Sequence, residues 1–265
     1  MTTGAKSAPD VVHEIVHVEQ VMGTVVSFHL HVRSSSPEPS ATVGPALERA
    51  CAELHRADAV FSTWKPDSPL SKVRSGALPL DAAPAEIGEV LDVCEYVRAL
   101  TGGWFDPWAM PGGVDPTGIV KGWAVERALG ALRVPDIAAG SVNAGGDVAV
   151  LGRPDDQDSW RIGIRHPWRP DALACVVLVE HAVATSGTYE RGAHLIDPRT
   201  GEANVRAASA TVVGPSLTLA DGLATALAVG GDEALSRIAE VPRYEGYLVR
   251  TDGSEAWTEG MPFAE

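Results

Sequence analysis

Asp221 and Thr225 are the residues of this chain whose types and spacing most clearly suggest chemistry. They lie in the segment LTLADGLATALAVGG, residues 217–231, which has helical spacing and in which Asp221 is the only charged residue. A buried ionised carboxylate is costly unless it is paired, hydrogen-bonded or bound to a metal. Residues at i and i+4 share a helix face, so these two offer adjacent oxygens, which magnesium or calcium prefers. The alternative is a helix-entry carboxylate that accepts backbone N–H bonds.

The segment Asp115-Pro116-Thr117-Gly118 is typical of a helix start, and a helix start can bind an anion. Asp115 would cap the helix, Pro116 would take its first position, and Gly118 would allow close approach to the backbone. The free N–H groups would favour a pyrophosphate, and Lys121 could add a positive charge about one turn further on. Most such motifs only begin helices, so the motif alone is weak.

An aromatic loop precedes this helix start. Residues 103–108, GWFDPW, place Trp104, Phe105 and Trp108 beside the carboxylate of Asp106. Such rings suit stacking on a planar heteroaromatic ligand. The alternative is that they anchor the loop on the protein core, as aromatic residues in glycine- and proline-rich loops more often do.

His194 is a candidate general base, because its unperturbed pKa lies near working pH. The alternation in AHLIDP predicts a strand with His194 and Ile196 on one face and Leu195 and Asp197 on the other. A lone histidine is more often structural, and Asp197 also begins a predicted β-turn. The run NAGGD at 143–147 predicts a strand with a glycine bulge, since it matches neither dinucleotide nor Walker spacing.

The surrounding pattern supplies the elements that must position these residues. Residues 11–32 alternate as two strands or one bent strand with Gly23 at the bend, and FSTWKPDSPLSKV reads as a turn-rich segment. Short strands with turn signals follow between residues 141 and 214. Helices are predicted from Pro45 to about Phe61, around 87–97, from Pro116 to about Leu132, at 217–231 and at 233–239. This partial segregation of strands and helices favours an α+β fold.

Composition restricts the class of protein. The chain has 265 residues, 45% hydrophobic, and a formal charge of −14 without a basic run, which weighs against nucleic acid and anionic membranes as partners. An anionic small substrate would need local positive potential or a bound cation. The three cysteines form no C-x-x-C pair and read as buried thiols of a reducing compartment. With no signal-like or membrane-spanning stretch recognised, we expect a cytoplasmic protein without a membrane anchor.

Taken in order, eight segments resemble the FAD:protein FMN transferases, the ApbE-type flavin transferases. They extend over about Met22 to Gly231, and their order is more specific than any single motif. The segments are MGT, FSTWKPDSPLS, GGWFDP, DPTGIVKGWAVE, VNAGGD, ATSGTYER, HLIDPRTG and ADGLATAL.

The resemblance implies an activity and a fold. Family members use magnesium to split the pyrophosphate of FAD, attach FMN through a phosphoester to a threonine of an acceptor protein, and release AMP. Such phosphoryl transfer depends on positioning and charge neutralisation, which a divalent ion supplies. The implied fold is α+β, with mixed β-sheets layered with helices in an ApbE-like, T-fold-like architecture. We expect residues 1–10 to be disordered and residues 11–265 to form a single flavin transferase domain.

The resemblance also implies site residues. Magnesium would take the Gly118 carbonyl, the Asp221 carboxylate and the Thr225 hydroxyl, and His194 would deprotonate the incoming threonine. The residues implied to surround FAD are Met22, Trp104, Phe105, Asp106, Asp115, Lys121 and Ile196.

Two departures and two alternatives accompany this resemblance. Many relatives are exported or membrane-anchored, and the loop between Asp106 and Asp115 is short for the family, which leaves the lining of the flavin pocket open. The same site would also serve a magnesium-dependent FAD pyrophosphatase, in which water replaces threonine. A flavin-binding protein without turnover is the third possibility, although it would have no evident need for a metal site.

Overall fold

Antiparallel β-strands form the centre of the structure, a computed structural model that describes residues 11–34, 41–154, 158–187, 195–203 and 206–265. The large sheet has the strand order β1-β2-β3-β4-β7-β8-β9-β10, and β5 and β6 form a separate hairpin. The strands are β1 (Val11–Val21), β2 (Thr24–Ser34), β3 (Ile137–Ala144), β4 (Asp147–Leu151), β5 (Trp160–His166), β6 (Arg169–Val179), β7 (Ala182–Gly187), β8 (Ala207–Gly214), β9 (Glu245–Arg250) and β10 (Glu255–Trp257).

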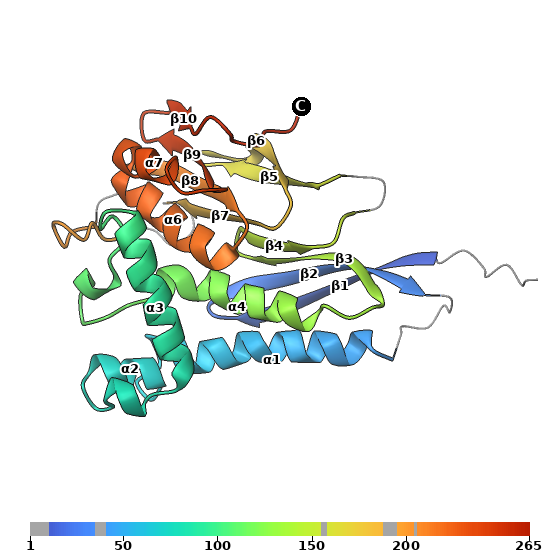
Figure 1. Ribbon diagram of the computed structural model, residues 1–265, viewed down its shortest axis with the longest axis horizontal. Helices are drawn as coiled ribbons and strands as arrows, with labels where there is room; N and C mark the ends of the chain where they lie inside the picture. Colours follow the sequence, from blue (N-terminus) through green and yellow to red (C-terminus); the bar gives the residue numbers. More distant parts are fainter. Residues whose placement is uncertain (1–10, 35–40, 155–157, 188–194, 204–205) are drawn as a thin grey trace, which may run out of the picture.

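Helices cover one face of the large sheet. Helices α1, α4 and α6 lie in succession across it, and α3 runs across their ends (Figure 1). The helices are α1 (Val43–Phe61), α2 (Pro69–Arg74), α3 (Ala85–Leu100), α4 (Thr117–Ala131), α6 (Leu217–Gly230) and α7 (Asp232–Ile238), with 3-10 turns η1 (Leu80–Ala82) and η2 (Pro107–Ala109). The predicted α+β class is confirmed, and the pairings between the described strands are antiparallel.

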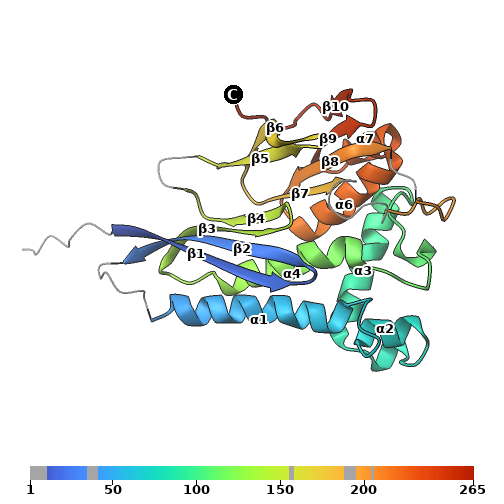
Figure 2. The same cartoon turned by 180° about the vertical axis from the view of Figure 1, so that it is seen from behind.

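Two hydrophobic cores lie on opposite faces of the large sheet. The larger one fills the space between the sheet and the helices, and the smaller one lies under the β5–β6 hairpin. In β4, Val148 and Val150 pack in the smaller core whereas Ala149 packs in the larger one, as the alternation of a strand requires. Seen from behind, the β5–β6 hairpin lies beside β8 and β9 and near the C-terminus (Figure 2).

Two glycine positions predicted as bulges or bends are instead hairpin turns. Met22 and Gly23 have φ of 54° and 68° between β1 and β2, and Gly145 and Gly146 have φ of 60° and 99° between β3 and β4. Positive φ at both central residues is the type I′ pattern, whose twist matches the flanking strands. Of the two alternatives for residues 11–32, the two strands are therefore confirmed and the bent strand was wrong. The glycine bulge at 143–147 was also wrong, because its two glycines form a tight turn.

Helices α4 and α6 pack closely against each other. A Cβ at Gly122 would lie 2.5 Å from the Leu217 carbonyl oxygen and 3.0 Å from the Asp221 Cβ. A Cβ at Gly222 on α6 would lie 2.9 Å from the side chain of Ile119 on α4. Almost every residue of α6 is buried, as expected for a helix that is apolar all round. Small residues thus allow the two helix backbones to touch where Asp221 lies.

This contact predicts a large difference between two glycine substitutions in α4. Gly122→Ala places a methyl group against the α6 backbone and should lower the free energy of unfolding by about 1–3 kcal/mol. Gly130→Ala is the matched control, because no atom lies within 4 Å of its added Cβ. It should be neutral or raise stability by up to about 1 kcal/mol. Urea unfolding of both variants measures the difference, and equal stabilities would contradict the tight crossing.

Candidate active site

One pocket brings together the start of α4, the second half of α6, the end of β7 and the loop before α4. The space not filled by atoms is about 880 Å³, which includes the open mouth of the pocket. Nine of the eleven residues expected at the site line it, namely Trp104, Phe105, Asp106, Asp115, Gly118, Lys121, Ile196, Asp221 and Thr225.

Asp221 lies in the second turn of α6 and is 3% exposed. Its Oδ2 accepts the backbone N–H of Gly122 on α4 at 2.9 Å. The alternative interpretation as a helix-entry carboxylate is therefore wrong, because the N–H that it accepts belongs to another helix. An α-helical N–H ordinarily bonds to the carbonyl four residues earlier, which for Gly122 is the Gly118 carbonyl. Asp221 therefore bonds to the turn of α4 that begins near Gly118, through the Gly122 N–H.

Thr225 and Gly118 complete a group of oxygens beside this carboxylate. A Cβ at Gly118 would lie 3.3 Å from the Thr225 Oγ1 and 3.1 Å from Phe105, so the glycine leaves a cradle that a side chain would fill. Thr225 follows Asp221 by one helical turn, and its Oγ1 lies 3.5 Å from the Ser186 Oγ. A carboxylate, a hydroxyl and a carbonyl are the hard donors that magnesium or calcium prefers, so the residues fit such an ion.

Lys121 is held by a second buried carboxylate. Its Nζ lies 2.8 Å from the Oδ2 of Asp147, whose Oδ1 accepts the N–H of Thr185 at 3.0 Å. Burial, and next the negative charge of Asp147, raise the pKa of Asp221 well above its usual range, while Lys121 opposes the shift. A single lysine here faces two buried acids. A cation at Asp221 would relieve their repulsion.

Asp106 and Asp115 hold the loop between them in place. Asp106 Oδ2 accepts the Arg98 Nε–H at 2.8 Å, and its Oδ1 accepts the Trp108 N–H at 2.9 Å. Asp115 Oδ2 pairs with Arg74 at 3.0 Å. Both carboxylates are thus committed to protein partners, although they line the pocket.

The start of α4 differs by one residue from the expected one. The helix begins at Thr117 with Pro116 at the N-cap position, and the Asp115 Oδ1 accepts the Thr117 N–H at 3.1 Å and its hydroxyl at 2.7 Å. Asp115 therefore hydrogen-bonds to the first turn of α4 from one residue before the N-cap, instead of from the predicted N-cap position. A difference of one residue is common at helix ends.

The aromatic loop mainly packs against the protein. Trp104 is 2% exposed, with the Arg199 guanidinium 3.5 Å and the Arg206 guanidinium 4.8 Å from the centroid of its ring. Phe105 is also buried and packs against Gly118. Trp104 and Phe105 therefore anchor the loop on the protein core, as the alternative interpretation expected, and both also line the pocket. Trp108 is exposed.

Three other residues with a predicted role at the site are Met22, His194 and Ile196. Met22 lies in the β1–β2 turn against the larger core and is not among the residues that line the pocket. His194 lies outside the described residues. Ile196 lines the pocket and forms an isolated bridge to Ala203, and the part of the predicted strand before Leu195 lies outside the described residues. The predicted turn at Asp197 forms, with its Oδ1 accepting the Arg199 N–H.

Sequence reasoning missed the residues that support the site. Arg74 ends α2, directly after the segment read as turn-rich, and its guanidinium donates to the carbonyls of Pro111 and Gly112 in the pocket loop. Ser186 lines the pocket from β7. Asp147 was seen only as the end of a glycine-rich run. Its charge in an otherwise apolar strand was the available signal.

The fold and this pocket define a class of α+β proteins with an oxygen-lined, buried acidic site. The model of the ApbE family matches residues 22–112 and 109–248, so the chain belongs to the ApbE family.

The chain is similar to curated proteins and solved structures of this kind. A FAD:protein FMN transferase of Vibrio cholerae is 37% identical over 152 residues, 52% of this chain and 45% of that protein. A Rhodobacter capsulatus protein of the same name is 36% identical over 141 residues, 50% and 27%. The match thus spans less than half the length of either relative. The flavin transferase ApbE structure from Vibrio cholerae has a TM-score of 0.78 at 23% identity, covering 94% of this chain and 98% of that one.

A search of the helices in the described ranges finds none long and apolar enough to cross a membrane.

The raised pKa of Asp221 predicts how metal-free stability depends on pH. Because the folded-state pKa lies above the unfolded one, the stabilisation by the protonated form is present at low pH and is lost as the pH rises through the folded pKa. At pH 8 in EDTA, the Asp221→Asn variant should not show this loss of stability. Its melting temperature should equal or exceed that of the original chain. Magnesium should raise the melting temperature of the original chain by several degrees, at roughly 2–4 °C per kcal/mol, and leave the variant unchanged.

Asp197→Asn is the matched control for this experiment, because Asp197 is equally buried and does not line the pocket. It should keep the magnesium response. An equal magnesium response of the Asp221→Asn variant would refute the assignment of the cation to Asp221.

Proposed function

We propose that this chain is a magnesium-dependent FAD:protein FMN transferase, which moves FMN from FAD to a threonine hydroxyl of an acceptor protein and releases AMP. The observation that carries the proposal is the group of Asp221, Thr225 and Gly118 in a pocket that also holds Lys121. The names of the similar curated proteins support the same activity. Family membership supports FAD as the substrate.

Magnesium would be held by the Asp221 carboxylate, the Thr225 hydroxyl and the Gly118 carbonyl. When bound, it would neutralise charge on the pyrophosphate oxygens and thereby favour phosphoryl transfer. This explains how a protein with a formal charge of −14 could hold an anionic substrate. The start of α4 would add its N–H groups, and Lys121 would place its ammonium group beside the phosphates while still paired with Asp147.

The remaining pocket residues would position FAD. Phe105 and Ile196 offer apolar surface for a ring system, and the loop from Asp106 to Asp115 forms one wall. Arg74 binds two carbonyls of this loop. The loop is short for the family, and these contacts would fix its shape without a longer insertion. The role of Met22 would be indirect, through the β1–β2 turn that it helps to form.

In the transfer step, the threonine oxygen would form a bond to the phosphorus of the FMN half. The bond from this phosphorus to the bridging oxygen would break, and AMP would leave with that oxygen. The threonine hydroxyl loses its proton in the process, and we assign its removal to His194. General-base assistance of this kind typically contributes about 10²–10⁴-fold to the rate.

We further propose that residues 11–265 act as one domain in the cytoplasm. The larger core contains residues from β2 and β9 and from the helices α1, α4 and α6. This shared core supports a single folding unit. Cys51, Cys94 and Cys175 are all free thiols, which supports a reducing compartment.

Purified chain incubated with FAD, magnesium and a flavin-accepting threonine peptide tests the function. We expect the peptide to gain the mass of FMN, with one AMP per modified peptide, and no transfer in EDTA. AMP and free FMN with an unmodified peptide would indicate a pyrophosphatase. Bound FAD without AMP would indicate a flavin-binding protein. Asp221→Ala should lose activity together with its magnesium dependence.

The His194→Ala variant tests the general base. It should reduce transfer by at least about 100-fold while FAD affinity, measured by flavin fluorescence, changes little. Loss of FAD binding together with transfer would instead assign His194 to substrate binding.

A further inference from the structure

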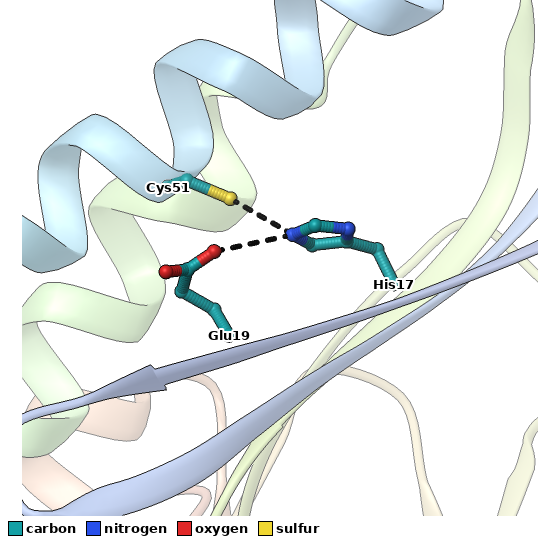
Figure 3. Close-up of side chains that lie close together, drawn as sticks. All are labelled: His17, Glu19 and Cys51. Atoms are coloured by element: carbon teal, nitrogen blue, oxygen red, sulfur yellow. Dashed lines mark hydrogen bonds and ion pairs between the residues drawn. The ribbon is translucent and has the colours of Figure 1, made fainter.

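A second cluster of metal-ligating side chains lies between β1 and α1, and none of its members lines the FAD pocket. His17 and Glu19 are two residues apart on β1, so both point to the same face of the strand. Cys51 and His55 are four residues apart on α1, so they share one face of the helix. Figure 3 shows His17, Glu19 and Cys51 directed toward one another from these two elements.

Three donor atoms of this cluster are already in mutual contact. The His17 Nε2 lies 3.5 Å from the Cys51 Sγ and 3.3 Å from the Glu19 Oε2. All three ligand atoms lie within 4.8 Å of one another. The His55 Nε2 lies 2.9 Å from the other Glu19 oxygen, Oε1. The carboxylate is therefore oriented from both sides.

The two separations at the His17 Nε2 agree with two edges of a zinc tetrahedron. Zinc binds nitrogen at about 2.0–2.1 Å, oxygen at about 2.0–2.2 Å and sulfur at about 2.3 Å. At the tetrahedral angle these bond lengths place nitrogen and oxygen about 3.3 Å apart, and nitrogen and sulfur about 3.6 Å apart. The contact of the His17 Nε2 to Glu19 is slightly long for a hydrogen bond, and both contacts of this nitrogen match these edges.

The His17 Nε2 lies between two possible partners. It faces both a carboxylate and a thiol, and it carries at most one hydrogen, which it can donate to only one of them. Glu19 also has a hydrogen bond with the Cys51 thiol. A cation between the three atoms would replace these hydrogen bonds and bind all three ligands at once.

The protonation state of Glu19 suits a metal ligand in advance, whereas that of Cys51 does not. Hydrogen bonds from His55 and His17 lower the pKa of Glu19, so it is a carboxylate at neutral pH. Burial, and next the charge of Glu19, raise the pKa of the Cys51 thiol. A metal would displace the thiol proton, so its affinity should increase with pH.

We propose that His17, Glu19 and Cys51 form a binding site for a thiophilic divalent cation of the zinc class. His55 orients the carboxylate through its second oxygen, as partners of metal ligands commonly do. The side chains of His17 and Glu19 are 37% and 25% exposed, so water can supply a fourth ligand. The ion joins the edge strand β1 to α1, since the site takes two ligands from the strand and one from the helix. This inference is independent of the proposed flavin transfer.

Cobalt(II) serves as the spectroscopic probe of this site. Among the described residues no cysteine lines the flavin pocket, so a thiolate-to-cobalt charge-transfer band in the near ultraviolet distinguishes the proposed site from that pocket. Titration of the full chain in saturating magnesium should give this band at one cobalt per chain, with the strong visible bands of tetrahedral cobalt, and zinc should abolish both. His17→Gln should weaken cobalt affinity by at least about tenfold.

Cys51→Ser should lose the band, and Cys175→Ser is the matched control, because Cys175 is a half-buried thiol on β6. The control should keep the band. Zinc should also raise the melting temperature of the original chain and the control, but not that of the Cys51→Ser variant. Circular dichroism shows whether each variant is folded. Absence of the band in the original chain, or its persistence in the Cys51→Ser variant, would overturn the proposal.

Discussion

The contact between α4 and α6 is the constraint on which the rest of the structure depends. It joins two apolar helices so closely that Gly122 has room for no side chain, and the Asp221 carboxylate accepts the N–H of the same glycine. Helix packing and the position of the acid are therefore set by one interaction. The same crossing brings Gly118 and Thr225 together at the mouth of the contact. The proposed cation site is thus a consequence of how the core is packed.

Charge inside this core explains why the site would attract a cation. Asp147 and Asp221 are both buried, and Lys121 is paired with the first of them. Burying the Asp221 carboxylate near that of Asp147 costs free energy, and for this reason the pKa of Asp221 is raised. Metal-free protein can reduce this cost by keeping a proton on Asp221, and metal-loaded protein would reduce it by exchanging that proton for a cation. Binding would then depend on pH as well as on the ligand geometry.

The sequence predicted what local patterns encode. Helical periodicity located the core of α1, α3, α4 and α6, and the lone charge in an apolar helix drew attention to Asp221. It did not predict the partners of these residues, because Gly122 and Asp221 are 99 positions apart, and Arg74 and Asp115 are 41 apart. No periodic pattern encodes such pairs.

Some features could not be predicted from the local sequence. Paired glycines suit a bulge and a type I′ turn equally well, so pairing partners were needed to distinguish them. The two arginines that lie against the ring of Trp104 come from distant segments. Asp147 was seen only as the end of a predicted glycine bulge, because only the fold brings Lys121 beside it.

The most direct test of the central claim is an anomalous-scattering map from crystals of the chain grown with FAD and manganese, which can replace magnesium at oxygen ligands. The account predicts a manganese peak bonded to the Asp221 carboxylate, the Thr225 hydroxyl and the Gly118 carbonyl, in contact with the FAD pyrophosphate. A pyrophosphate bound in this pocket without manganese at Asp221, or FAD bound elsewhere on the molecule, would contradict it.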